Sequence, residues 1–299
     1  MDAQLSACER RESSTLRKVC VKYKDSSVQK TKHLAAGQTL RVVRLAARTG
    51  WADFRRRYTW WSWLTAWVLR GALEVLFFAS IGLLLKNEDV FLYLLVARAL
   101  LVGVTETMLA VQTVSWERQE GTLDHLLMSQ VPTWSAFLGR SLQWIPSAVA
   151  TPLLLLFGLG PLLGLSYSWS TAGVTVLSVL VSAMASFGFA MFIAALVVRW
   201  PDARNLVANV AVAMTALLCG GFVPTSTWPG AVQGAASLVP FTHIVGVVSD
   251  AVLRNMTDFA WQRLTVTCII GFLWLIVGLV ALERFAEKGR LSPSSRATD

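Results

Sequence analysis

Six runs of apolar residues, separated by short polar segments, dominate the pattern of this chain. They cover residues 67–85, 91–115, 136–164, 172–198, 206–223 and 263–283. A helix needs about 20 such residues to cross the hydrocarbon core of a bilayer. Backbone groups in lipid must be hydrogen-bonded within their own segment, and these runs are too long and continuous for barrel strands. We therefore predict an all-α integral membrane protein with six transmembrane helices.

The stretch before the first run has a different, helical periodicity. One face carries apolar residues, namely Leu40, Val43, Ala47, Trp51 and Phe54, and another carries Arg41, Arg44, Arg48 and Arg55. This pattern predicts an amphipathic interfacial helix on the inner leaflet, followed by a tryptophan-rich anchor at headgroup level. Simple membrane anchoring and the cradling of a cytoplasmic partner both remain open as its role.

Polar and apolar positions also alternate with helical spacing between the second and third runs. Trp116, Leu123, Leu126 and Leu127 recur on one face of residues 116–132, while Glu117, Glu120, Asp124 and His125 face elsewhere. An amphipathic helix between two membrane spans is shaped to dock on another protein, and a solvated loop is the alternative.

Residues 219–240 are apolar but cannot form one helix. Glycine and proline interrupt them at Gly220, Gly221, Pro224, Pro229, Gly230, Gly234 and Pro240, while Phe222, Val223 and Trp228 keep the segment apolar. Short broken helices that dip back into the bilayer satisfy both constraints. We therefore expect a re-entrant segment before the last span, with a plain hydrophobic loop as the alternative.

Composition and charge place the chain in the membrane and orient it. Hydrophobic residues make up 55% and charged residues 15% of the sequence, and 22 of the 27 Lys and Arg residues lie on one predicted side. The positive-inside rule therefore predicts a multi-pass protein of the cell (inner or plasma) membrane with both termini cytoplasmic. The net charge of +9 favours contact with anionic membrane lipids over nucleic acid.

These patterns divide the chain into four parts. Residues 1–37 are predicted to be a disordered cytoplasmic tail. Residues 38–66 are the interfacial helix and aromatic anchor, residues 67–284 the six-span domain, and residues 285–299 a second cytoplasmic tail.

Four charged residues fall inside the first two predicted spans, where charge is costly and tends to be functional. If the first two spans pack antiparallel around a tight turn, Arg70 lies level with Glu106, and Glu74 is one helical turn from Arg70. We expect Arg70, Glu74 and Glu106 to form a charge cluster, with snorkelling of Arg70 as the alternative. Arg98 falls level with Phe78 and has no obvious acidic neighbour, so a cation–ring contact and a cavity-facing position both stay open.

Together these features resemble the permease subunit of a type II ATP-binding-cassette exporter of the drug- and antibiotic-export branch. The likeness rests mainly on the pattern Glu-Arg-x-x-Gly-Thr-Leu-Asp-x-Leu-Leu-x-Ser-x-x-Pro that begins at Glu117 and ends at Pro132. The resemblance implies that this segment is the coupling helix, which seats on a separate ATPase subunit. Its contact residues would be Glu117, Arg118, Glu120, Gly121, Thr122, Leu123 and Asp124. It also implies an outer gate made by Gly220, Gly221, Phe222, Pro224, Trp228, Pro229 and Pro240.

The function implied is export of an amphipathic small molecule, such as a drug, antibiotic or lipid-like compound. The chain has no phosphate-binding loop of its own, so we expect a transport subunit without enzymatic, metal or cofactor sites. ATP and Mg²⁺ would be bound by the partner ATPase, and a second permease copy or a homologous permease would complete the pathway. Two other classes stay open: a secondary transporter driven by an ion gradient, and a non-transporting scaffold that recruits a partner through residues 116–132.

Overall fold

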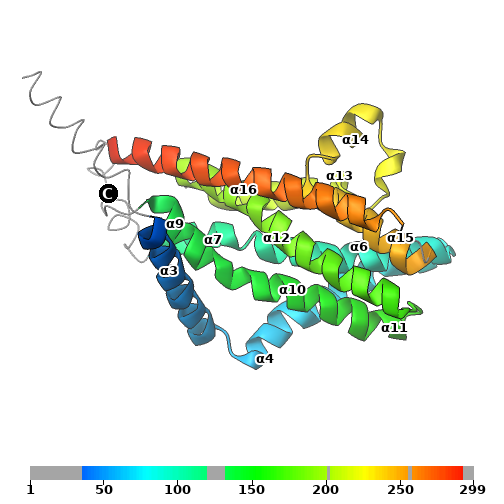
Figure 1. Cartoon of the computed structure of the whole chain (residues 1–299). Helices are drawn as coiled ribbons and strands as arrows, with labels where there is room; N and C mark the ends of the chain where they lie inside the picture. The colour runs from blue at the N-terminus through cyan, green and yellow to red at the C-terminus, as the bar shows by residue number, and fades with distance from the viewer. Residues whose placement is uncertain (1–35, 120–131, 201–202, 255–257, 292–299) are drawn as a thin grey trace, which may run out of the picture.

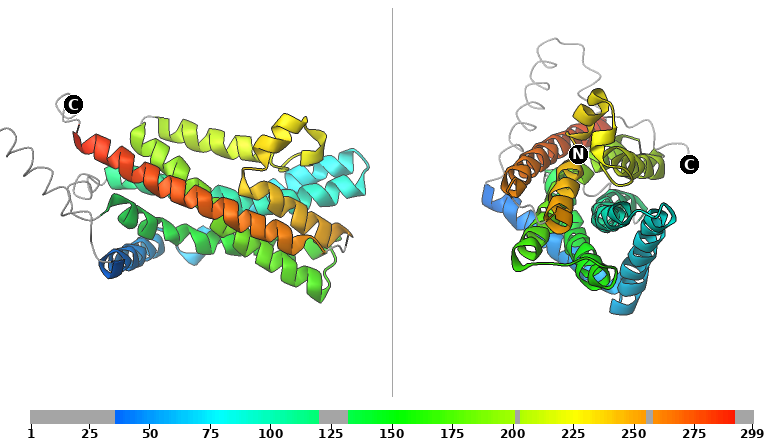
Figure 2. Two further views of the ribbon diagram at one scale, coloured as in Figure 1. Left: turned by 45° about the horizontal axis from the view of Figure 1, so that its top comes forward. Right: turned by 90° about the vertical axis from the view of Figure 1, so that its right-hand side faces the viewer.

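The computed structural model describes residues 36–119, 132–200, 203–254 and 258–291. Over these ranges every regular element is a helix and no strand occurs. Most helices run roughly side by side along one axis, as Figures 1 and 2 show. The predicted all-α class is therefore confirmed for the part of the chain that the structure describes.

Five helical segments are long and apolar enough to cross a membrane. They are Trp60–Leu84, Glu88–Thr113, Thr133–Leu162, Trp169–Arg199 and Ala260–Glu287. The first consists of α4 (Trp60–Trp63), the π-helical turn η1 (Leu64–Leu69) and α5 (Arg70–Leu84). The second is α6 (Glu88–Thr107) with the start of α7 (Ala110–Gln119), the fourth is α12 (Trp169–Arg199), and the last lies within α16 (Ala260–Leu291).

The third of these segments is broken several times. It consists of α9 (Thr133–Ser141), the 3₁₀ turn η2 (Leu142–Trp144), α10 (Ile145–Leu154), the π-helical turn η3 (Leu155–Leu159) and α11 (Gly160–Leu162). Pro152 lies inside α10 and Pro161 follows η3. Proline has no amide hydrogen to donate to the preceding turn, which accounts for interruptions near these positions.

The structure corrects the fifth predicted span. The helix in that region, α13 (Arg204–Leu218), stops at Leu218 instead of continuing to Val223. The chain turns at Gly220, which has a φ of +93°. A Cβ atom on the neighbouring Gly221 would lie 2.6 Å from the carbonyl oxygen of Ala216. Glycine alone tolerates both conditions.

A further apolar helix follows that the sequence pattern did not predict. After the 3₁₀ turn η5 (Thr225–Thr227) and α14 (Gly230–Ala236), α15 (Pro240–Arg254) runs antiparallel to the first part of α16. The α14–α15 pair is bent by 98° and is apolar enough to count either as one broken span or as a re-entrant loop. The described residues thus contain five spans, or six if this pair counts as one.

The core of the bundle lies around α6 and α12. Of the apolar window of α6, 89% is buried, whereas the windows of the first and last spans are 22% buried. Close backbone approach joins α12 to α16, because a Cβ atom on Gly188 would lie 2.3 Å from the carbonyl oxygen of Gly271. Small residues at such crossings are typical of helix packing in membranes.

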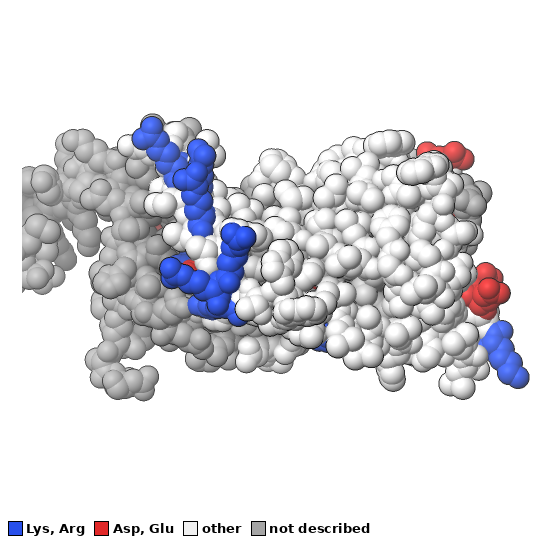
Figure 3. Space-filling view, turned by 90° about the horizontal axis from the view of Figure 1, so that it is seen from below, with Lys and Arg blue, Asp and Glu red and all other residues white. Residues whose placement is uncertain are grey.

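The two ends of the bundle differ in charge. At one end α3 (Ala36–Arg57) lies at an angle to the other helices, next to α9. Six exposed arginines lie on α3, at positions 41, 44, 48, 55, 56 and 57, and Figure 3 shows basic side chains gathered there. We call this the basic end. The turn between α5 and α6 lies at the far end, where Lys86, Glu88 and Asp89 are exposed. On the face that Figure 3 shows, the surface between the ends is largely uncharged.

Candidate functional site

The helix α3 rests on α9 through two glycines. A Cβ atom on Gly139 would lie 2.5 Å from the carbonyl oxygen of Val43, and one on Gly50 would lie 2.9 Å from that of Arg140. The guanidinium of Arg140 also pairs with the carboxylate of Asp53 at 2.9 Å. Contacts with α9 therefore hold α3 in place. Because α9 is the first part of the third span, a shift of α3 would displace that span directly.

An aromatic cluster joins four elements at the basic end. The buried ring of Trp144 in η2 lies 5.6 Å from Phe54 of α3 and 5.8 Å from Trp116 of α7. Tyr58, which follows α3, contacts Trp67 of the first span at 5.2 Å. Burial raises the pKa of the Tyr58 phenol, and the neighbouring arginine at position 57 opposes this effect. Large rings in contact resist independent motion, so α3, α7 and the first and third spans are mechanically connected here.

A cation strengthens this connection next to the predicted coupling segment. The guanidinium carbon of Arg57 lies 4.2 Å from the ring centroid of Trp116, within the range of a cation–π contact. The indole Nε1 of Trp144 donates to Thr113 Oγ1 at 3.3 Å. The helix that leads into residues 120–131 is thus fixed to α3 and η2 immediately before the described part of the chain is interrupted.

The residues assigned to ATPase coupling lie at and beyond this interruption. Glu117 and Arg118 belong to the last turn of α7, but their side chains lie outside the described residues. Glu120, Gly121, Thr122, Leu123 and Asp124 also lie outside them. Their role therefore stays a prediction.

Arg98 forms the centre of one buried polar cluster, in the middle of α6. Its guanidinium nitrogen Nη2 lies 3.3 Å from Glu74 Oε1, with the two side chains 4% and 27% exposed. The guanidinium carbon lies 3.5 Å from the ring centroid of Phe78 and 4.4 Å from that of Phe222. The expectation that Arg98 has no acidic neighbour is wrong, because Glu74 turns toward it and not toward Arg70. The cation–ring contact at the level of Phe78 is present.

Glu106 lies in a second cluster, nearer the basic end. Its buried carboxylate accepts a hydrogen bond from the Ser147 hydroxyl, which in turn accepts one from Trp63 Nε1 at 2.8 Å. Thr151 is buried one helical turn beyond Ser147. Among the described residues neither Thr151 Oγ1 nor Glu106 Oε1 has a hydrogen-bonding partner.

The expected ion pair between Arg70 and Glu106 does not form, although Arg70 lies near enough to act electrostatically on the Glu106 carboxylate. Arg70 is exposed on the first span, and no ion pair within 4 Å joins it to Glu74 or Glu106 in the described structure. The matched-depth argument gave the correct register but not the direction of the side chains. Arg70 faces outward, where it can snorkel to a polar boundary at lower cost than burial.

Two residues of the predicted outer gate, Gly220 and Phe222, contact α6 just beyond the end of α13. The Tyr93 hydroxyl donates to the carbonyl oxygen of Gly220 at 2.8 Å, and Phe222 packs on Arg98 as described above. Trp228 Nε1 is buried, and the Trp228 carbonyl accepts from Gln233 Nε2 at 2.7 Å. The remaining members, Gly221, Pro224, Pro229 and Pro240, lie at the ends of α13, η5, α14 and α15. Whether this segment enters the bilayer stays a prediction.

Sequence reasoning missed several members of these clusters. Ser147 and Trp144 were not assigned any role, because a hydroxyl or an indole in an apolar run carries no signal of its own. Trp63 was assigned only to the aromatic anchor at headgroup level. The spacing of Ser147 and Thr151, four residues apart in an otherwise apolar stretch, could have indicated one polar helix face.

Comparison with known proteins adds independent information. The family model described as ABC-2 type transporter matches residues 41–253. The probable multidrug ABC transporter permease YbhR of Escherichia coli K12 is 25% identical over 158 residues, which cover 51% of this chain and 41% of that protein. The protein of the same name from Escherichia coli O157:H7 gives the same values. The match thus covers about two fifths of the length of these relatives.

Proposed function

Since this chain belongs to the ABC-2 type transporter family, we propose that it is the transmembrane subunit of an ATP-driven exporter. Its cargo would be an amphipathic small molecule that leaves the cytoplasm or the inner leaflet. The observation that carries this proposal is the family match over residues 41–253, which includes most of α3, the 117–132 segment and the residues of the outer gate. The similarity to a probable multidrug permease favours drug-like cargo.

The energy source in this proposal is a separate ATPase subunit, which binds ATP and Mg²⁺. The basic end faces the cytoplasm, as the distribution of Lys and Arg favours, so both termini are cytoplasmic. The acidic coupling helix at Glu117–Asp124 docks on basic groups of the ATPase, and Gly121 allows close backbone approach. A second permease copy, or a related permease, encloses the pathway.

The aromatic cluster gives this mechanism a physical route into the membrane. A push on the coupling helix moves α7, whose Trp116 is held by Trp144 and Arg57. Trp144 transmits the displacement to the third span and Phe54 transmits it to α3. Packed cores transmit displacements because they have few voids. In the middle of α6, which precedes α7 in the same span, Arg98 contacts Phe222, so this span reaches the outer gate.

The test reverses the charge of the coupling helix. In the Glu117→Lys, Glu120→Lys variant we expect ATPase that copurifies with the tagged chain in mild detergent to fall by about tenfold, equivalent to about 1.4 kcal/mol. ATP hydrolysis in the eluate should fall with it. The matched control is Glu88→Lys, Asp89→Lys, which makes the same charge change on exposed residues at the far end and should leave both readouts unchanged.

Each result has a separate meaning. Normal copurification and hydrolysis in the coupling variant, at normal membrane insertion, would remove the coupling assignment. Absence of any ATPase activity from preparations of the native chain would remove the exporter proposal itself. Equal losses in both variants would show a nonspecific effect of charge and also count against the assignment.

A further inference from the structure

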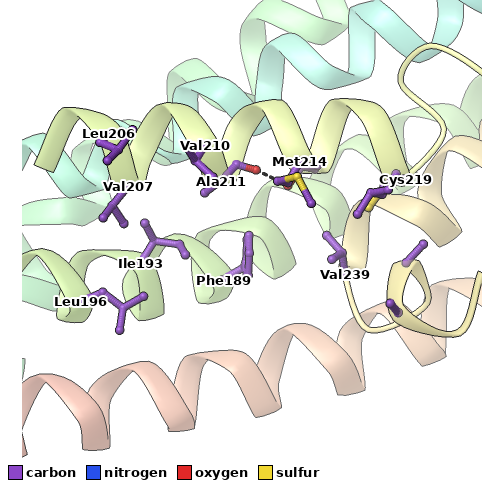
Figure 4. A pocket seen from close by; sticks show the side chains of 14 residues that line it. Phe189, Ile193, Leu196, Leu206, Val207, Val210, Ala211, Met214, Cys219 and Val239 are labelled. Carbon is purple, nitrogen blue, oxygen red and sulfur yellow. Dashed lines mark hydrogen bonds between the residues drawn. The ribbon is translucent and has the colours of Figure 1, made fainter. Parts of the chain in front are cut away.

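An elongated slot runs between α12 and α13. Its volume is about 470 Å³, within the range of ligand-binding cavities. In Figure 4 apolar side chains of the two helices point toward one another across it, among them Phe189, Ile193, Leu206 and Val210. Ala235 and Ala236 of α14, and Val239 between α14 and α15, also line the slot. The slot lies away from Arg98 and Glu106, neither of which lines it.

The lining offers almost nothing to a polar ligand. Its hydroxyl group, that of Thr215, already donates to the carbonyl oxygen of Ala211 at 2.8 Å. Cys219 is buried and nearly all other lining residues are aliphatic or aromatic. A polar group placed there would lose its hydrogen bonds to water without replacement. The slot therefore suits hydrocarbon.

The shape of the slot restricts the hydrocarbon further. The lining runs along α13 from Leu206 to Cys219, about 20 Å by helical rise. Leu206, Val210 and Met214 line the slot and are nevertheless 67%, 49% and 47% exposed, so it opens sideways. An extended chain that lies parallel to the helices and enters from the surrounding bilayer matches this geometry.

The charged residues from the end of α12 to the start of α13 are Arg199, Asp202 and Arg204, two positive and one negative, which leaves a net charge of +1 by sequence. Arg199 is exposed and follows the lining residue Leu196 by about one helical turn. Position 204, two residues before Leu206, is also arginine. Basic residues at the end of an apolar site attract anionic headgroups.

We propose that this slot is a lipid site that holds one acyl chain of an anionic phospholipid, with the headgroup beside Arg199. The site is additional to the proposed export function, since its occupant comes from the bilayer and stays bound without ATP hydrolysis. By filling the space between α12 and α13, the acyl chain would hold α13 at a defined distance from the bundle.

The experiment uses the native chain in nanodiscs of phosphatidylglycerol that carries a photoactivatable diazirine on one acyl chain. After illumination, adducts are mapped by mass spectrometry of peptides. We expect adducts on slot residues such as Val207 and Met214. In Ala211→Phe they should fall by roughly tenfold, because the inserted ring occupies the volume that the acyl chain needs.

The matched control is Ala213→Phe. Ala213 lies on the same helix, is exposed and does not line the slot, so adducts in the slot should persist. Val207→Phe serves as an independent filling variant if Ala211→Phe fails to fold. Equal adduct yields in filled and control variants would overturn the proposal. Slot residues without adducts in the native chain would also overturn it, including the case in which a second copy covers the slot.

The headgroup is tested in the same nanodiscs. Phosphatidylglycerol should give about fivefold more slot adducts than phosphatidylcholine, the factor expected for one basic residue near an anionic surface. Arg199→Gln should remove that preference and keep the acyl adducts. Equal yields from the two lipids in the native chain would refute the anionic part. Because no ATPase is present, failure here leaves the exporter proposal untouched.

Discussion

Arg98 and Glu106 lie on the same helix, about 12 Å apart along its axis, and are equally buried, at 4% and 3% exposed. Their surroundings differ. Arg98 has a carboxylate partner in Glu74 and two aromatic rings. Glu106 has the hydroxyl of Ser147, and no basic group lies within ion-pair distance of it in the described structure.

This difference separates two reasons for burying charge in a membrane. A buried charge that contacts a counter-ion and aromatic rings contributes to packing. Removing it leaves the counter-ion buried without a partner, which costs stability. A carboxyl group without a counter-ion costs stability in its charged form, and it can be replaced by a neutral group of the same shape at little cost. Arg98 therefore stabilises the fold, whereas Glu106 is the better candidate for a functional role.

The largest expected effect is the loss of Arg98. Arg98→Met leaves Glu74 without its partner, and we expect a loss of about 3 kcal/mol in the free energy of unfolding, the lower end for a broken buried pair. Glu74 is 27% exposed, which limits the loss. Thermal or denaturant unfolding in lipid nanodiscs measures it, and adding Glu74→Gln to the variant should restore most of the stability.

The control for this prediction is the ion pair between Arg263 and Asp250. It is shorter, at 2.8 Å, but the arginine is 42% exposed. Arg263→Met should therefore cost about 1 kcal/mol or less, as exposed ion pairs do. Equal losses in the two variants would contradict the view that burial, rather than the distance between the charges, decides the effect.

The sequence predicted most of the membrane spans and the family, but it did not predict the break after α13. The apolar runs predicted the first four spans and the last one, which lies within α16, because lipid imposes continuous hydrophobic segments. The early end of α13 and the presence of α15 were not predicted. Both follow from the turn at Gly220 and Gly221, and hydrophobic periodicity does not indicate where along an apolar run such a turn occurs. The family resemblance, based on the pattern after Glu117, is confirmed by the match to the ABC-2 type transporter family.

The charged residues were predicted as a group but paired incorrectly. Helical rise predicted the level of Arg98 opposite Phe78, and the structure has that contact. The choice between Arg70 and Arg98 as the partner of Glu74 depends on which way the side chains point around the first span. That direction is set by tertiary packing, including the π-helical turn at Leu64–Leu69, which shifts the faces of the helix.

The second prediction concerns the Glu106 cluster, where we expect changes of intermediate size in the free energy of unfolding. Ser147→Ala leaves both the Glu106 carboxylate and Trp63 Nε1 without their hydrogen-bonding partner, and we expect a loss of about 2 kcal/mol. Glu106→Gln keeps an acceptor for Ser147 and removes the possible charge, so its stability should lie within about 1 kcal/mol of the native chain. Unfolding in the same nanodiscs measures both. A loss for Glu106→Gln as large as that for Arg98→Met would erase the distinction between the two clusters.

The smallest expected effect is that of Arg70, and it decides whether Glu106 has a counter-ion after all. Arg70 is exposed and forms no ion pair among the described residues, so Arg70→Ala should change the free energy of unfolding by about 0.5 kcal/mol or less, as surface substitutions usually do. In a double-mutant cycle with Glu106→Gln the two effects should add to within about 0.5 kcal/mol, whereas the cycle of Arg98→Met with Glu74→Gln should show a much larger coupling. A coupling of about 1 kcal/mol or more between Arg70 and Glu106, as residues in contact show, would mean that the arginine turns inward in the membrane. Glu106 would then have a counter-ion, as Arg98 has in Glu74. It would no longer be the better candidate for a functional role.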